Sequence, residues 1–117
     1  MSKRYDQESA RMNAIELKQK WKAGQPSPGI WLRLTDPTIV DLIGDVGFDW
    51  AMFDAEHVAY DFQTLQNLFI ALKGLPTLPF VRVPSNDLAY IKRVLDIGAA
   101  GVLVPQITSG TEAAAAV

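Results

Sequence analysis

The sequence contains no cysteine and only one histidine, and both facts exclude classes of functional site. Without thiols, disulfides, zinc–thiolate centres and a cysteine nucleophile are excluded. A single histidine argues against a metal site built from several imidazoles. No lysine lies at the end of a predicted strand, so a Schiff-base mechanism has no candidate residue.

Long apolar runs, basic stripes and phosphate-binding motifs are also missing. No apolar run reaches about 18 residues, so no membrane span is expected. The charged segment 1–8 does not have the pattern of a secretory signal. The net charge of -2 predicts no nucleic-acid partner. No Walker A, G-x-G-x-x-G or G-x-S-x-G motif occurs. We therefore expect a cytoplasmic protein without a membrane partner.

Hydrophobic periodicity predicts one helix followed by four strand–helix units. Residues 1–8 are predicted to form a disordered tail, and residues 9–117 to form the folded part. Helices are expected over 9–22 and from Asp36, Asp61, Asp87 and Thr111, and strands over 30–34, 49–53, 79–83 and 101–105. Strands that alternate with helices predict an α/β fold with a parallel sheet.

Four such units are compatible with two architectures. They could form a small doubly wound sheet, or half of a (β/α)8 TIM barrel, which typically takes about 250 residues. The alanine-rich segment 111–117 ends inside a helical pattern without a capping residue. This favours the barrel, with an N-terminal helix and the first four βα units in this chain and the C-terminal half after Val117.

Three polar residues follow the second predicted strand at the point where its apolar pattern stops: Asp54, Glu56 and His57. The carboxyl ends of strands in α/β folds are where ligands bind. An imidazole can take or give a proton near neutral pH, which makes His57 a candidate general base or acid. The two carboxylates could orient its ring or bind a substrate. The alternative is an ordinary polar surface loop.

Two further charged residues stand in places where a partner is needed. Arg82 lies in an apolar strand, and its permanently charged guanidinium requires an anion there. That anion could be a structural carboxylate or the carboxylate of a substrate. Asp96 lies near the end of a predicted helix, where an acid opposes the helix dipole. It has either a specific partner or only solvent around it.

Taken together, the segments resemble the HpcH/HpaI aldolases, a family of class II, metal-dependent pyruvate aldolases. Each piece is weak alone, but their order and spacing over residues 13 to 117 are specific. The matching segments are 29–32, 47–50, 54–57, 81–87, 91–99 and 102–105. The resemblance implies a (β/α)8 barrel of which this chain holds the first half.

The resemblance also implies an activity for the full-length protein. It would be a carbon–carbon lyase that reversibly cleaves a 4-hydroxy-2-oxo acid into pyruvate and an aldehyde by a retro-aldol reaction. Arg82 and Trp31 would contact the substrate. A divalent metal, Mg²⁺ or Mn²⁺, would be the cofactor, with its ligands in the C-terminal half and none in this chain. The family likeness further implies a homo-oligomer.

Residue roles follow from the same resemblance. His57 corresponds to the catalytic base, and Asp96 to the acid that raises its basicity. Arg82 corresponds to the arginine that stabilises the enolate of pyruvate. Asp54 and Glu56 correspond to supporting acids around the histidine.

Two alternatives stay open. One is a related enzyme on the same scaffold, either a citrate-lyase-β-like carbon–carbon lyase or an enolate-using synthase. The other is a non-catalytic half-barrel fragment that only assembles with a partner chain.

Overall fold

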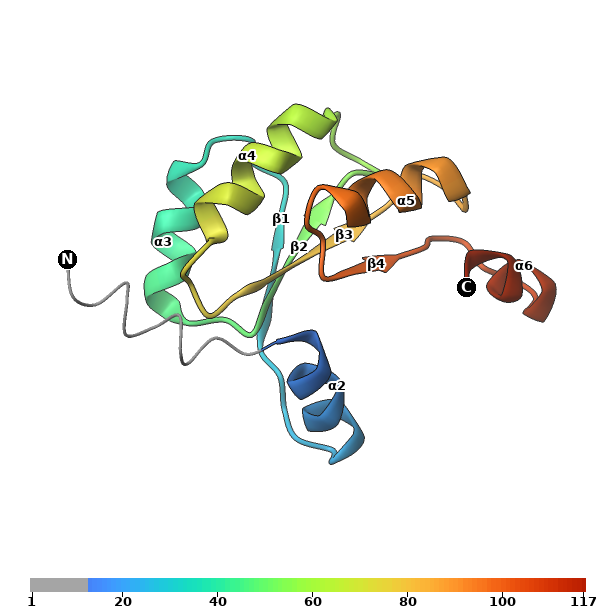
Figure 1. Ribbon diagram of the computed structural model, residues 1–117, viewed down its shortest axis with the longest axis horizontal. Coiled ribbons are helices and arrows are strands. Elements are labelled where there is room, and N and C mark those ends of the chain that lie inside the picture. The colour runs from blue at the N-terminus through green and yellow to red at the C-terminus, as the bar shows by residue number, and fades with distance from the viewer. Residues whose placement is uncertain (1–12) are drawn as a thin grey trace.

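The computed structural model describes residues 13–117, which form one parallel sheet and its connecting helices (Figure 1). The predicted tail and residues 9–12 of the first predicted helix lie outside the described residues. The elements, in chain order, are α2 (Ala14–Lys22), β1 (Gly29–Leu32), α3 (Thr38–Val46), β2 (Trp50–Asp54), α4 (Phe62–Leu72), β3 (Leu78–Arg82), α5 (Leu88–Asp96), β4 (Gly101–Leu103) and α6 (Gly110–Ala116).

The four strands are hydrogen-bonded in the order β1-β2-β3-β4, and every pair is parallel. Each strand therefore lies beside the next strand of the chain, with a helical crossover between them. The predicted α/β class and parallel sheet are confirmed. This sequential order is also that of a (β/α)8 barrel, whereas a doubly wound sheet reverses its strand order at a switch point.

Local sequence signals set most of the helix ends. The side chains of Asp61 and Asp87 accept hydrogen bonds from backbone N–H groups at the starts of α4 and α5, as predicted. Asn13 and Glu16 form a reciprocal capping box at the start of α2. Gly47 ends α3 with φ of 80°, a left-handed conformation that glycine adopts without strain.

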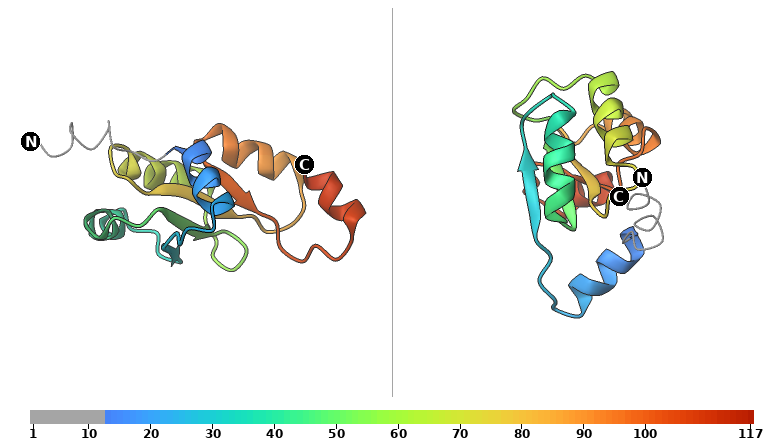
Figure 2. Two further views of the ribbon diagram at one scale, coloured as in Figure 1. Left: turned by 90° about the horizontal axis from the view of Figure 1, so that it is seen from below. Right: turned by 90° about the vertical axis from the view of Figure 1, so that its left-hand side faces the viewer.

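The main core lies between the sheet and the layer formed by α3, α4 and α5, which cover one face of it (Figure 2). Strand residues that point to this face, such as Phe53 and Val81, have no exposed surface. They meet leucines of α4, among them Leu65 and Leu68, which are equally buried. The Phe53 and Phe69 rings pack edge to face with centroids 5.4 Å apart.

Apolar residues at helical spacing are not all buried. Six of them are exposed, with relative accessibilities of 45–71%: Ile15, Trp21, Leu42, Val46, Leu88 and Leu95. The described helices bury only some of their apolar residues, and α6 buries none. The predicted strands also differ from the observed ones by one or two residues at their ends.

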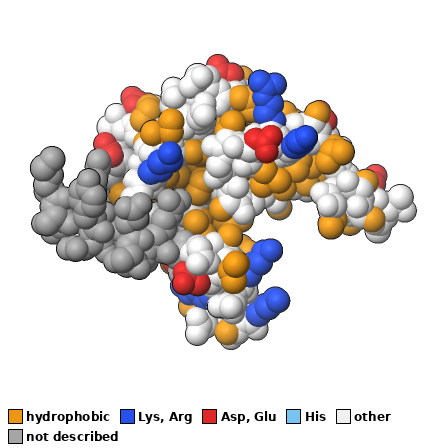
Figure 3. Space-filling model, in the orientation of Figure 1, with side chains coloured by type: hydrophobic (Ala, Val, Ile, Leu, Met, Phe, Trp, Pro, Cys, Tyr) orange, Lys and Arg blue, Asp and Glu red, His pale blue; other side chains and the backbone are white. Residues whose placement is uncertain are grey.

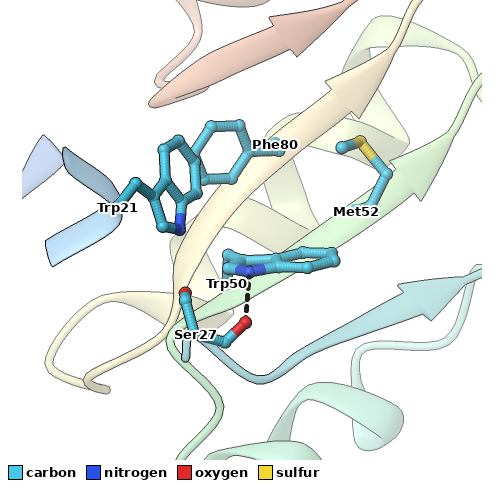
Figure 4. Close-up of a pocket in the computed structure, with 5 residues that line it drawn as sticks. All are labelled: Trp21, Ser27, Trp50, Met52 and Phe80. Atoms are coloured by element: carbon cyan, nitrogen blue, oxygen red, sulfur yellow. Dashed lines mark hydrogen bonds between the residues drawn. The ribbon is translucent and has the colours of Figure 1, made fainter. Parts of the chain in front are cut away.

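The other face of the sheet carries aromatic side chains. Trp50, Met52 and Phe80 line a hollow of about 320 Å³ together with Trp21 from α2 (Figure 4). The Trp50 indole N–H donates to the Ser27 carbonyl at 3.2 Å, which fixes the ring over the sheet. Hydrophobic side chains are visible on the surface between the helical layer and α2 (Figure 3). This hollow is therefore lined mainly by apolar groups.

Candidate active site

A charged cluster lies at the opposite, carboxyl ends of the strands. Asp54 and Arg82 are the last residues of β2 and β3, and the strand register places them side by side. Arg82 Nε donates to Asp54 Oδ1 at 3.0 Å and Nη2 donates to Oδ2 at 2.7 Å. The anion that Arg82 required is thus a carboxylate of the protein itself, held by a two-pronged ion pair.

A second arginine, which the sequence analysis did not single out, reaches the same carboxylate. Arg33 directly follows β1, and its Nε donates to Asp54 Oδ2 at 3.1 Å. The signal that would have found it is strand alternation, because Arg33 is two residues from Trp31 and so shares its face of the sheet. The two arginines differ in exposure, since the Arg33 side chain is 62% exposed and that of Arg82 only 19%.

The charge of Asp54 is strongly stabilised. Burial opposes ionisation of this carboxyl, but hydrogen bonds from the Arg82 guanidinium and the His57 amide outweigh it and hold its pKa well below its usual range. The same hydrogen bond to Asp54 raises the pKa of Arg82. Asp54 therefore remains a carboxylate at any pH at which the protein is expected to work.

His57 and Glu56 continue the cluster away from the sheet. The His57 backbone N–H donates to Asp54 Oδ1 at 3.2 Å, which fixes the loop. The imidazole Nε2 lies 3.4 Å from Glu56 Oε1, and the His57 side chain is 55% exposed. Glu56 Oε2 is buried without a hydrogen-bond partner and lies 3.4 Å from Arg82 Nε. Glu56 thus stands between the imidazole and the guanidinium.

Trp31 and Tyr60 support the arginines. The Arg82 guanidinium carbon lies 4.8 Å from the centroid of the Trp31 ring, a cation–π arrangement. The Tyr60 hydroxyl donates to the Leu34 carbonyl at 2.6 Å and so ties down the chain after β1. Burial and the nearby Asp54 charge raise the pKa of Tyr60 to about 12.

Asp96 does not lie with the other predicted site residues. It is exposed at the last position of α5, which runs back to the amino ends of the strands. There the chain re-enters the sheet, where the Ala100 N–H donates to the Pro79 carbonyl at the start of β3. The structure brings together His57, Arg82, Asp54, Glu56 and Trp31. The predicted role of Asp96 beside His57 has no support within this chain.

The described residues do not fit a divalent metal on their own. Both oxygens of Asp54 face guanidinium groups, which leaves them unsuited to bind a cation. Within residues 13–117 no group of three or more His, Asp or Glu side chains is arranged to hold a metal ion. Nor does any helix in this part of the chain have the length and apolar character to cross a membrane.

A charged cluster at the carboxyl ends of sequentially ordered parallel strands is where (β/α)8 enzymes place their active sites. The family comparison agrees with this class. The model of the HpcH/HpaI aldolase/citrate lyase family matches residues 28–117. The chain belongs to this family.

Individual relatives support the assignment. The chain is 41% identical over 110 residues to 5-keto-4-deoxy-D-glucarate aldolase of Salmonella paratyphi A (strain ATCC 9150 / SARB42), covering 91% of this chain and 43% of that protein. It is 39% identical over 97 residues to hydroxypyruvate/pyruvate aldolase of Pseudomonas aeruginosa, covering 83% and 36%. The chain thus spans less than half the length of these curated relatives.

A solved structure gives the same picture. The crystal structure of HpcH/HpaI aldolase from Desulfitobacterium hafniense DCB-2 superposes with a TM-score of 0.78 at 35% identity. The match covers 86% of this chain and 39% of that chain. The described sheet and helices therefore correspond to part of a larger aldolase-family fold.

Proposed function

We propose that the whole protein is an aldolase that cleaves a 4-hydroxy-2-oxo acid into pyruvate and an aldehyde. One observation carries the proposal: an accessible imidazole, His57, stands at the same strand ends as a guanidinium fixed by a buried carboxylate. Retro-aldol chemistry needs a proton acceptor and a fixed positive charge close together. The names of the aldolase relatives support this reaction class.

In this proposal His57 removes the proton from the 4-hydroxyl group of the substrate. The bond between C3 and C4 then breaks, and its electron pair moves to the 2-oxo group. This step yields the aldehyde and the enolate of pyruvate, which is protonated to pyruvate. Glu56 Oε1 faces the imidazole Nε2, which favours a proton on that atom and leaves Nδ1 as the acceptor.

Arg82 supplies the positive charge. Its fork is occupied by Asp54, so Nη1 is the nitrogen that remains for the substrate. A cation fixed in this way stabilises the enolate oxygen without reorganisation during the reaction. Trp31 forms the floor beneath the guanidinium, as its ring contact indicates. Arg82 therefore acts on the pyruvate half of the substrate.

The family resemblance adds a divalent metal, Mg²⁺ or Mn²⁺, with ligands outside this chain. Because the described residues do not form its site, we derive no step through it. A cytoplasmic location and a homo-oligomeric assembly belong to the same proposal. Any catalytic role of Asp96 belongs to the same proposal. Asp96 lies outside the charged cluster of this chain, so in this geometry it does not act on His57 from within that cluster.

The test uses the whole protein and measures pyruvate release from 4-hydroxy-2-oxo acids. Arg82→Met should weaken binding of the 2-oxo acid and lower turnover, because the charge acts in both ground and transition states. Arg93→Met, which removes a guanidinium from the outer helix α5, is the matched control and should change neither. The proposal would be refuted if the whole protein released pyruvate from none of the 4-hydroxy-2-oxo acids tested.

A further inference from the structure

Two loops at the carboxyl ends of the strands carry polar groups of the site. The β1 loop (residues 33–37) contributes Arg33, and the β2 loop (residues 55–61) contributes Glu56 and His57. All five residues of the β1 loop are exposed, so packing does little to hold it. Its position therefore depends on the hydrogen bonds that it makes with other parts of the chain.

Tyr60 joins the two loops. Its hydroxyl donates to the Leu34 carbonyl of the β1 loop at 2.6 Å, and it lies 3.5 Å from the Leu32 carbonyl. Tyr60 is only 7% exposed, and its ring packs edge to face on Phe53 with centroids 6.3 Å apart. Tyr60 is thus a buried anchor of the β2 loop whose hydroxyl reaches across to the β1 loop.

Asp54 holds the other end of the β2 loop. The His57 N–H donates to Asp54 Oδ1 at 3.2 Å, and the Val58 N–H donates to the Asp54 carbonyl at 3.2 Å. Arg33 Nε donates to Asp54 Oδ2 at 3.1 Å and so connects Asp54 to the β1 loop. The contacts form a closed ring, which runs from Asp54 along the β2 loop to Tyr60, across to the β1 loop, and back through Arg33.

Arg82 is fixed in a different way. It ends β3, and the strand register places it beside Asp54, with which it forms the two-pronged ion pair. The position of Arg82 therefore does not depend on Tyr60. His57 lies in the β2 loop, outside the sheet, with its side chain 55% exposed. Its place relative to Arg82 depends on how both ends of that loop are held.

We propose that Tyr60 is a positioning residue, whose hydroxyl locks the β1 and β2 loops together and thereby sets the place of His57 relative to Arg82. The inference rests on the proposed aldolase function and adds a residue to its machinery. Tyr60 acts through the loop that carries the base. Because small displacements of a reacting group lower the rate strongly, loss of this lock should reduce turnover while the 2-oxo end still binds at Arg82.

The test compares Tyr60→Phe with Thr77→Val in the whole protein, at a temperature well below the unfolding of either variant. Thr77 is the matched control, because its buried hydroxyl donates to the Phe48 carbonyl at 2.7 Å, directly before β3 at the opposite end of the sheet. Tyr60→Phe should lower kcat for pyruvate release roughly 5- to 50-fold. Its affinity for 2-oxopentanoate, which lacks a 4-hydroxyl group and is not cleaved, should stay within about twofold. Thr77→Val should change neither quantity.

Hydrogen exchange of the backbone amides measures the lock itself, independently of activity. Peptides that cover the β1 and β2 loops should exchange roughly 3- to 10-fold faster in Tyr60→Phe, the factor that corresponds to the loss of one hydrogen bond. Thr77→Val should leave the exchange of both loops unchanged, because its lost hydrogen bond lies at the other end of the sheet.

Several results would overturn the inference. Unchanged kcat in Tyr60→Phe, or an equal loss of kcat in Thr77→Val, would mean that the Tyr60 hydroxyl contributes stability alone. Affinity for 2-oxopentanoate that falls as far as kcat would mean that Tyr60 acts on Arg82 instead of His57. Unchanged exchange of the β1 loop would show that no lock exists. Failure of the proposed function is separate: if the original protein released no pyruvate, the aldolase would be refuted, and the exchange experiment would still decide whether Tyr60 joins the two loops.

Discussion

Asp54 and Arg82 end neighbouring strands in register and form a two-pronged ion pair in which only the arginine reaches solvent. The Asp54 side chain has 0% relative accessibility and that of Arg82 has 19%. The carboxylate is thus committed to the protein, while the guanidinium keeps one edge toward the site. We infer that Asp54 is a structural anion that fixes Arg82 and Arg33, and that it is not a ligand for substrate or metal.

The first prediction concerns Asp54→Asn, which removes the charge and keeps the shape. The folded pKa of Asp54 is lowered, so its stabilising effect is present above the unfolded value near 3.9 and is lost as pH falls through the folded value. The variant should therefore melt at lower temperature at pH 7, and the difference should narrow below about pH 4. Thermal unfolding of the whole protein across pH measures this.

Asp45→Asn is the control, because Asp45 is an exposed acid on α3. It should melt within a degree or so of the original protein at every pH, as surface substitutions usually do. An Asp54→Asn variant with an unchanged melting temperature at pH 7 would contradict the structural role of this carboxylate.

The second prediction concerns Tyr60→Phe. Loss of the hydroxyl leaves the Leu34 carbonyl without its 2.6 Å partner, which should cost about 0.5–1.5 kcal/mol. The folded pKa of Tyr60, about 12, exceeds the unfolded value near 10, so the folded protein binds this proton more tightly. Its stabilising effect is complete below about pH 10 and declines as pH rises toward 12.

Denaturant unfolding of the whole protein between pH 8 and 11 measures the effect. The stability gap between the original protein and Tyr60→Phe should shrink at the alkaline end. A gap that stays constant up to pH 11 would show that the Tyr60 hydroxyl has no raised pKa in the folded protein.

The third prediction concerns a glycine beneath an aromatic ring. A Cβ atom at Gly29 would lie 2.0 Å from ring carbons of Trp50, too close to be accommodated without movement. Gly29→Ala should therefore destabilise the whole protein by about 1–3 kcal/mol through overpacking. Gly110→Ala is the matched control, since a Cβ there meets nothing within 4 Å. Equal stability of the two variants would contradict the placement of Trp50.

Much of the fold could be predicted because its signals are local. Asp61, Asp87 and Gly47 mark helix ends through hydrogen bonds and backbone angles that depend only on nearby residues. Burial was harder to predict, because it depends on what lies across the surface. Leu88 and Leu95 fit a helical apolar pattern but point away from the sheet, so periodicity alone overestimated the buried face.

The site residues that lie at the carboxyl ends of strands could be predicted from the sequence. Asp54, His57 and Arg82 stand out because polar residues interrupt apolar strands at their carboxyl ends. The pairing of Arg82 with Asp54 was not readable, since it depends on the register of β2 and β3. Arg33 was missed because, although it lies within the predicted strand 30–34, it looks like an ordinary surface arginine. Only the family resemblance placed Asp96 beside His57. In the structure Asp96 lies at the amino ends of the strands, away from His57.

The last prediction concerns His57 as the base. In the whole protein, His57→Ala should lower kcat by on the order of 10²–10⁴, the usual contribution of a positioned general base. Affinity for 2-oxo acids should stay within about twofold, because the imidazole meets the 4-hydroxyl group and Arg82 holds the 2-oxo end. Single-turnover pyruvate release and calorimetry with 2-oxopentanoate measure the two quantities separately. Unchanged turnover would mean that His57 is an exposed loop residue without a role in proton transfer. Weakened binding of 2-oxopentanoate would mean that His57 binds the substrate and does not transfer the proton.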